Sequence, residues 1–327
     1  MTTTMPGADW AAFVDQEYLA SFVPGGGAAL KFAARTDGGS VAALGDLVAE
    51  AAVRRDLLVA RVDAATTRLH LADQFLFAVA AQIDWAETVD RVLGDFIREA
   101  GFAPAAPGAP GDEPLFRRLA TANDLPPEMV QMELRRAIAG HVLKDRRLSK
   151  DFRVAMTHLA LARLSGGPEE QATFDTIIDW LAGRNRAVSA VKPYQIHARI
   201  SRANARYVYE SMLLWVASAG HPGLVVIMDI SRLGVAKNPR DGNQWYTRAG
   251  LLDAYELLRQ FIDSVDRLTS SFIVVLADVS FLDEDPTGRG FGAYQALSAR
   301  VVDEVRDAEL VNPLSSLVRI ADPGGAA

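Results

Sequence analysis

Residues 223–230 read GLVVIMDI, an apolar run with branched side chains that closes on Asp229. A run this short, preceded by His221-Pro222, is typical of a central strand that is buried on both faces. Open α/β sheets bind their ligands at the carboxyl ends of such strands. Asp229 therefore has two interpretations, which stay open at this point. It is either a magnesium ligand of a nucleotide-hydrolysing site, or an acid that only caps the strand and starts a turn.

Four more apolar segments predict strands on either side of this one in the sequence. A glycine-containing turn and a helix at Val41–Arg55 join the first two of them. That order is the strand–turn–helix–strand unit with which a doubly wound sheet begins, so we expect an α/β fold. The four segments are Ala28–Arg35, Leu57–Asp63, Phe272–Ala277 and Leu317–Ile320.

A second acid, Asp278, follows the predicted strand Phe272–Ala277. We expect the strands that end at Asp229 and Asp278 to be neighbours. Paired carboxylates could bind a magnesium ion directly, or they could form an acid/base pair as in a hydrolase. Neither interpretation is specific, because strand-end acids also cap the helices that follow them.

The turn after the first predicted strand lies where a phosphate-binding loop would be. Residues 36–41 read TDGGSV, whereas a working GxxxxGK[ST] loop ends in a lysine and a hydroxyl. Its next basic residues, Arg54 and Arg55, lie over three helical turns further on. The literal match at residues 25–32 fails, because Leu30 and Phe32 replace the glycine and the hydroxyl and Lys31 falls inside the strand. We therefore do not expect hydrolysis at an ordinary rate.

The bulk composition excludes several classes of protein. The 327 residues contain no cysteine, which removes disulfides, thiolate metal sites and thiol nucleophiles, and the five histidines show no ligand spacing. There is no GxSxG and no GxGxxG after a strand. The amino terminus lacks a secretory signal, and no apolar run approaches the roughly 20 residues of a membrane span. We expect a soluble cytoplasmic protein with no membrane partner and a net charge of −7.

The middle of the chain is helical by pattern. A segment rich in proline, alanine and glycine at residues 101–114 predicts a linker or exposed loop. We expect three parts: residues 1–100 as the first part of the α/β domain, 101–200 as a helical insertion, and 201–327 as the second part of the domain.

Between Asp179 and Glu210 the sequence has no acidic residue. On a helix that begins near Ala198, Arg199, Arg202 and Arg206 would share one face. These arginines are candidates for contact with a nucleic-acid backbone. The interpretation that we favour is a solvated face, or arginines that meet acids elsewhere in the fold.

Three sequence stretches carry a resemblance when they are taken with the order of the elements: HPGLVV at 221–226, YELLRQFID at 255–263 and NPLSSLVRI at 312–320. The chain resembles the ATP-binding protein of bacteriophage exclusion (BREX) defence systems and its P-loop relatives, best over Ser211–Ile320. The resemblance implies an AAA-like (ASCE) P-loop fold, with a parallel five-stranded sheet flanked by helices and carrying a helical insertion. It also implies ATP and Mg²⁺ as cofactors, and other subunits of a defence complex or further copies of the chain as partners.

The departures from the family pattern fall on its catalytic parts. The positions that would bind the nucleotide are Asp37, Gly38, Gly39, Ser40 and Val41, without the lysine of the family's loop. The strand that ends in Asp-Glu in the family ends here in Asp229-Ile230, and the polar sensor of the fourth strand is replaced by Ala277-Asp278. Arg300 matches an arginine that would act on a neighbouring subunit.

The interpretation that we favour is a degenerate P-loop subunit that is not an enzyme and acts as a scaffold or regulator. One alternative is an active ATP hydrolase in which Asp229 and Asp278 share the magnesium ion and Arg35 or Lys31 replaces the lysine. Another is a DNA-contacting accessory subunit. Under the first interpretation the chain need not bind ATP or Mg²⁺ at all.

Overall fold

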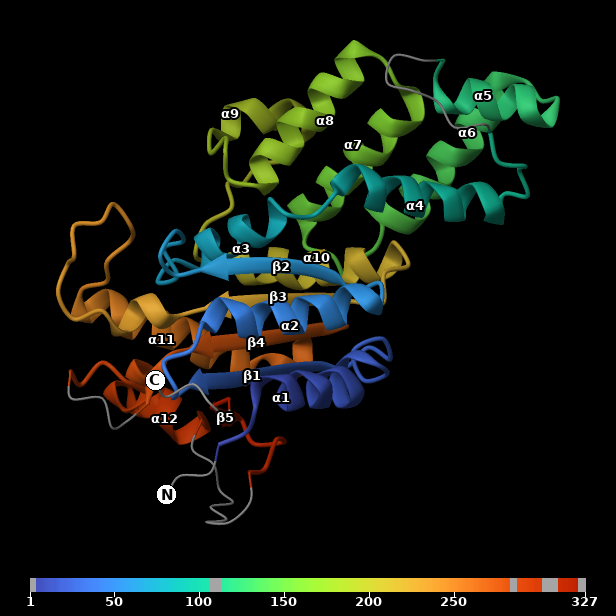
Figure 1. Cartoon of the computed structure of the whole chain (residues 1–327). Helices are drawn as coiled ribbons and strands as arrows, with labels where there is room; N and C mark the ends of the chain where they lie inside the picture. The colour runs from blue at the N-terminus through green and yellow to red at the C-terminus, as the bar shows by residue number, and fades with distance from the viewer. Residues whose placement is uncertain (1–3, 106–112, 283–286, 302–310, 323–327) are drawn as a thin grey trace. The chain divides into compact units, whose positions relative to one another are not determined.

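All five predicted strands form, and they pair in one sheet whose neighbours run parallel (Figure 1). The computed structural model describes residues 4–105, 113–282, 287–301 and 311–322. The strand order is β2-β3-β4-β1-β5, so β3 and β4 are neighbours as predicted. Each strand lies within one residue of its predicted bounds: β1 (Ala28–Arg35), β2 (Leu58–Asp63), β3 (Leu224–Asp229), β4 (Ser271–Ala277) and β5 (Leu317–Ile320).

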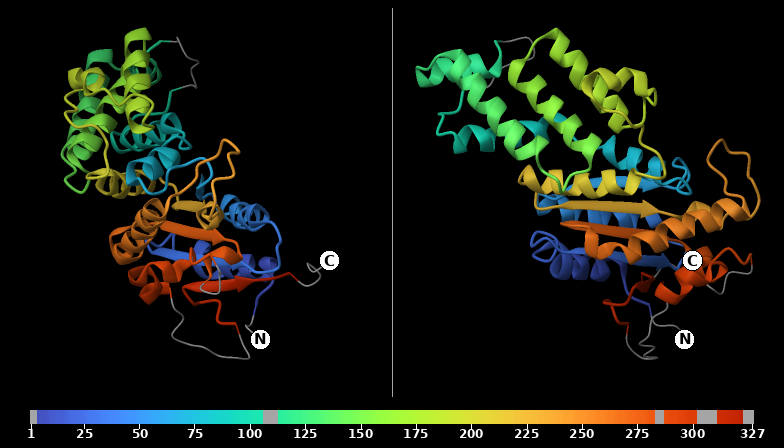
Figure 2. Two further views of the ribbon diagram at one scale, coloured as in Figure 1. Left: turned by 90° about the vertical axis from the view of Figure 1, so that its left-hand side faces the viewer. Right: turned by 180° about the vertical axis from the view of Figure 1, so that it is seen from behind.

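Helices cover both faces of the sheet, because alternate strand residues point to opposite faces and nearly all are apolar. On one face, α1 (Gly7–Val14) and α2 (Val41–Arg54) pack with the sheet in a core that includes Trp10, Val48 and Ile227. On the other face, Phe281 stacks on Phe32 of β1 at 5.5 Å and contacts Tyr255 of α11 (Arg248–Asp263). The α2 and α11 helices are each in front of the sheet in one of two opposite views (Figures 1 and 2).

Two further helices complete this second layer. The α3 helix (Ala72–Ala80) packs on α11 through Phe75 and Phe261, whose rings lie 4.8 Å apart. The α12 helix (Gln295–Val301) also lies against α11. An all-parallel sheet covered on both faces, with a strand–turn–helix after β1, is consistent with a P-loop-like fold.

The chain divides into a sheet unit, Met1–Gln82 with His221–Ala327, and a helical unit, Ile83–Gly220. The predicted insertion at 101–200 falls inside the helical unit, and part of the predicted linker at 101–114 lies outside the described residues. The helical unit is built around α7 (Lys150–Ser165), whose Phe152, Met156 and Leu159 are fully buried. Its other helices are α4 (Trp85–Glu99), α5 (Leu115–Asn123), α6 (Pro127–Ile138), α8 (Pro168–Leu181), α9 (Val188–Val191) and α10 (Ala205–Ser218). Within the described helices, no apolar stretch has the length and hydropathy needed to cross a bilayer.

Candidate functional site

The carboxyl ends of the parallel strands bring four aspartates to one edge of the sheet. Each accepts a hydrogen bond from the backbone N–H two residues further along, as in an Asx turn. The oxygen–nitrogen distances are 2.9 Å for Asp37 with Gly39, 2.7 Å for Asp63 with Ala65, 2.9 Å for Asp229 with Ser231 and 2.9 Å for Asp278 with Ser280. The predicted acids therefore lie at one edge, and every one of them also has a turn-forming role.

Asp229 is the most buried of the predicted acids in electrostatic terms. Burial raises the pKa of its carboxyl above the usual range, and repulsion from Asp63 and Asp278 adds to the effect. Asp63 stands directly opposite Asp229 in the parallel pairing of β2 with β3. The next residue, Ile230, is buried, with 1% of its surface exposed, and its apolar side chain cannot polarise a water molecule.

Asp278 begins the short 3₁₀ helix η6 (Val279–Phe281). Its carboxylate accepts hydrogen bonds from both the backbone N–H and the hydroxyl of Ser280. Among the described residues, no three histidine, aspartate or glutamate side chains gather in a way that could hold a metal ion. In this arrangement Asp278 acts as a turn-former, and its share in a magnesium site stays a prediction.

The loop after β1 is occupied by its own side chains. Arg35, the last residue of β1, is 7% exposed, and its guanidinium bonds both oxygens of Asp37 at 3.0 and 2.8 Å. The same guanidinium donates to Asp322 at 2.7 Å and to the carbonyl of Ser40 at 3.3 Å. We call Arg35, Asp37 and Asp322 the arginine clamp.

The arginine clamp uses the groups that a phosphate would need. The N–H of Gly39, which a phosphate loop would offer to its ligand, donates to Asp37 instead. The Arg35 guanidinium lies directly under the loop, since a Cβ on Gly39 would be 2.6 Å from Cζ of Arg35. Hydrogen bonds from Arg35, Asp322 and Gly39 hold the pKa of Asp37 well below its usual range. Asp37 is therefore an anion that the protein itself supplies to the loop.

The net charge of the arginine clamp is negative, because one cation meets two carboxylates. A triphosphate at this place would meet two anions and no cation that is not already paired within the clamp. As they stand, these groups do not fit a triphosphate.

Lys31, the other candidate for the missing lysine, points elsewhere. Its ammonium donates to the carbonyls of Leu314 and Ser315, the latter at 3.1 Å, and lies 5.5 Å from the ring centre of Tyr18. Lys31 pairs with Val274 within the sheet. Four strand residues separate it from Arg35, about 13 Å along β1, so it does not reach the loop.

Arg300 lies at the opposite end of the sheet from Asp229. Its guanidinium pairs with Asp263, the last residue of α11, which leads into the amino end of β4. Asp263 also pairs with Arg259, whose guanidinium holds both oxygens of Glu256 at 2.7 and 2.6 Å. This network engages Arg300 within its own chain, and action on a neighbouring subunit stays a prediction.

The predicted helix near Ala198 is wrong, and so is the shared face of the three arginines. The α10 helix begins only at Ala205, so Arg199 and Arg202 lie in the irregular segment before it. There the side chain of Asn204 accepts from the N–H of Ser201 at 2.7 Å and donates to the carbonyl of Arg199 at 3.1 Å. Such side-chain bonds to the backbone compete with helix formation.

The charge of the arginine stretch is divided between paired and exposed side chains. Arg206 lies 3.5 Å from Glu210 and 5.3 Å from the ring of Tyr207, so it meets an acid, as the favoured interpretation expected. Arg199 and Arg202 are exposed. Contact with nucleic acid stays a prediction for these two.

Two residues that the sequence did not single out fix the loops beside Asp229. The hydroxyl of Tyr246 bonds the carbonyls of Ala64 and Thr67 at 3.0 and 2.5 Å and accepts from the N–H of Leu69. Burial raises the pKa of Tyr246 to about 12. The buried Arg289 donates to the carbonyl of Tyr246 at 2.9 Å, and also to that of Leu233. No local motif announces either residue, because all their partners are backbone atoms of distant segments.

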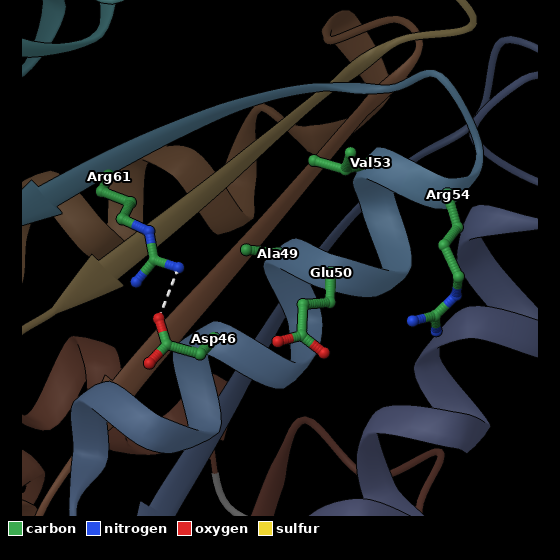
Figure 3. A pocket seen from close by; sticks show the side chains of 6 residues that line it. All are labelled: Asp46, Ala49, Glu50, Val53, Arg54 and Arg61. Carbon is green, nitrogen blue, oxygen red and sulfur yellow. Dashed lines mark ion pairs between the residues drawn. The ribbon is translucent and has the colours of Figure 1, made fainter.

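A shallow hollow lies over α2 and the edge strand β2, and Arg61 and Asp46 form an ion pair of 2.7 Å across it (Figure 3). The exposed Val53 and the side chains of Glu50 and Arg54 complete its wall. None of the predicted site residues lines it. The hollow is therefore separate from the edge that carries the aspartates.

A model of the family described as "BREX system ATP-binding protein BrxC/D" matches residues 120–322, well over half of the chain. The matched region contains β3, β4 and β5, and it begins after β1 and the loop of the arginine clamp. No protein of curated function and no solved structure matches the chain.

Proposed function

The chain belongs to the family of BREX system ATP-binding proteins BrxC/D, and on that premise we propose that it is a subunit of a phage-defence complex that does not hydrolyse ATP. It would act as a scaffold or regulator, through contacts with other subunits or with further copies of itself. The sheet would serve as a rigid support, with the AAA-like (ASCE) arrangement that the family resemblance implies.

The observation that carries this proposal is the arginine clamp. Phosphoryl transfer depends on positioned positive charge and backbone donors at the phosphates. In this chain the cation nearest the loop, Arg35, is held by Asp37 and Asp322, and Asp37 also takes the N–H of Gly39. Opening the loop for a nucleotide would cost these charge-assisted bonds and leave the carboxylates facing the phosphates.

A second observation supports the absence of hydrolysis. The residue after Asp229 is the buried Ile230, and Asp229 itself lies between two other carboxylates that raise its pKa. A water molecule at this edge would find no second acid next to Asp229 in sequence to orient it, as the glutamate of the family pattern would.

Phosphate release from Mg²⁺-ATP by the purified chain is the experiment that tests this proposal. The expected rate equals that of the Asp229→Ala variant, because neither protein has a working site. Release by the wild type that Asp229→Ala abolishes would contradict the proposal and support an active hydrolase in which Asp229 holds the magnesium ion. A second control, Asp241→Ala, removes an exposed carboxylate outside the edge and should leave any measured rate unchanged.

A further inference from the structure

The helix formed by α6 and the π-helical turn η2 (Ala139–Leu143) exposes a stripe of large apolar side chains in the helical unit. Met129 is 49% exposed, Met132 is 64% exposed and Leu143 is 40% exposed. With Arg136 and Gly140 between them, these positions follow one another at intervals of three and four residues. At helical spacing they lie on one face.

This face is not part of the core of the unit. The opposite side of the same helix carries Val130, Leu134, Ile138 and Val142, which are 0–3% exposed and already fill the interior. A Cβ on Gly140 would meet nothing within 4 Å, so the middle of the exposed face is open to an approaching chain. We call Met129, Met132, Arg136, Gly140 and Leu143 the methionine face.

Positive charge borders the methionine face. Between Arg135 and Lys150 the sequence has six basic residues and one acid, Asp145, in a protein whose net charge is −7. Asp145 pairs with Arg147 at 2.8 Å. Arg135, Arg136, Lys144 and Arg146 are exposed, and none of them makes an ion pair within the described part of the chain. The border is thus a local excess of positive charge on an acidic protein.

We propose that the methionine face is the docking site for an amphipathic helix of a partner protein, with an apolar stripe flanked by aspartate and glutamate. Methionine and arginine are the residues in which the cores of protein interfaces are enriched, and methionine adapts its shape to the side chains that it meets. Helix-in-groove recognition uses anchors at the same three- and four-residue intervals. The face is about 21 Å long from Met129 to Leu143, which matches a partner helix of about four turns.

Charge and apolar surface together favour a protein over a nucleic acid. Phosphates would satisfy Arg135, Arg136 and Lys144 but would leave Met129 and Met132 without apolar contacts. An acidic amphipathic helix satisfies both kinds of group at once. This inference does not depend on whether the sheet unit binds a nucleotide.

The test uses the full chain and a fluorescent synthetic helix on the order of 15 residues long, made of leucine, alanine and glutamate. Its leucines recur at helical spacing on one face, and a scrambled peptide of the same composition is the control. By fluorescence anisotropy we expect the first peptide to bind and the scrambled one to bind at least tenfold more weakly. We expect Met132→Ser to weaken binding at least tenfold, and the double variant Arg135→Glu/Arg136→Glu to do the same.

Matched variants elsewhere guard against general effects of apolar loss or charge reversal. Val53→Ser removes a side chain of similar exposure (66%) from α2, and Arg199→Glu/Arg202→Glu reverses two other exposed charges. Both should leave peptide binding unchanged. Equal binding of the two peptides, or binding that survives Met132→Ser, would overturn the proposal. So would binding of duplex DNA that the Arg135/Arg136 reversal removes and Met132→Ser does not affect.

Discussion

Asp37 is the residue on which the nucleotide question depends. It occupies the position in the loop where a bound phosphate would take the N–H of Gly39 and the guanidinium of Arg35. A carboxylate and a phosphate oxygen are alternative acceptors for the same donors. The chain therefore satisfies its own loop, and it does so with a side chain only two residues from the cation.

Replacing Asp37 with alanine should give the loop an affinity for polyphosphate that the wild type lacks. The change releases the N–H of Gly39 and two bonds of Arg35, and it removes one negative charge from the edge. We expect Mg²⁺-ATP to bind at least about tenfold more tightly, since each charge-assisted bond contributes about 1.5–3 kcal/mol. Calorimetric titration of the variant beside the wild type measures this difference.

The matched control for that substitution is Asp241→Ala. Asp241 also holds an arginine through both oxygens, with 2.7 Å distances to Arg232, and accepts from the N–H of Asn243 two residues on. It lies on the polar loop after β3, outside the arginine clamp, so its removal should not alter affinity. A folded Asp37→Ala protein with unchanged affinity would show that the arginine clamp is not what excludes the nucleotide.

Asp37 and Asp229 should affect stability with opposite signs. The pKa of Asp37 is lowered, so its ionised form stabilises the fold above pH 3.8, and this contribution is lost as the pH falls below that value. The pKa of Asp229 is raised, so its contribution is present below pH 3.8 and is lost as the pH rises through the folded-state pKa. At pH 7, Asp37→Asn should lower the free energy of unfolding by about 2 kcal/mol, whereas Asp229→Asn should raise it.

Urea unfolding of both variants at pH 7 and at pH 3 measures these changes. Both differences from the wild type should shrink at the lower pH, where the carboxylates of the unfolded chain are largely protonated. An Asp229→Asn protein that is less stable than the wild type at pH 7 would contradict the assignment of its raised pKa to burial.

Among the elements, the strands follow from sequence alone and several contacts do not. β3 and β4 were predictable because short, branched apolar runs between polar turns can hardly form anything but buried strands. The start of α10 was misplaced, because Asn204 bonds the backbone of Ser201 and Arg199 and delays the helix. No local pattern reveals that preference.

The candidate site divides in the same way. The sequence placed Asp229 and Asp278 at the ends of neighbouring strands, because strand ends are a local property. It could not place Asp322, which meets Arg35 across 287 residues of chain. Long-range pairs of this kind depend on the register of β1 with β5, and side-chain charge alone does not specify that register.

The loops between elements offer a direct test of one such contact. Tyr246→Phe removes the hydroxyl that bonds Ala64, Thr67 and Leu69, and it should destabilise the segment between β2 and α3 by about 1–2 kcal/mol. Hydrogen exchange measured by mass spectrometry should show faster exchange over residues 64–71. Tyr18→Phe is the matched control, because no hydrogen bond of its hydroxyl is present within the described residues. Unchanged exchange in the Tyr246→Phe loop would mean that the hydroxyl does not hold it.

At the scale of the whole molecule, charge is arranged unevenly over an acidic chain. The carboxyl edge of the sheet unit carries Asp37, Asp63, Asp229 and Asp278, and the helical unit carries the basic border of the methionine face. The first arrangement disfavours an anionic nucleotide, and the second favours an acidic protein surface. Both suit a subunit that works through protein contacts.

Calorimetric titration of the wild-type chain with Mg²⁺-ATP tests the central claim most directly. If the arginine clamp fills the loop, no binding heat should be seen up to about millimolar nucleotide, which corresponds to less than about 4 kcal/mol of binding free energy. Binding at micromolar concentration by the unaltered protein would contradict the account.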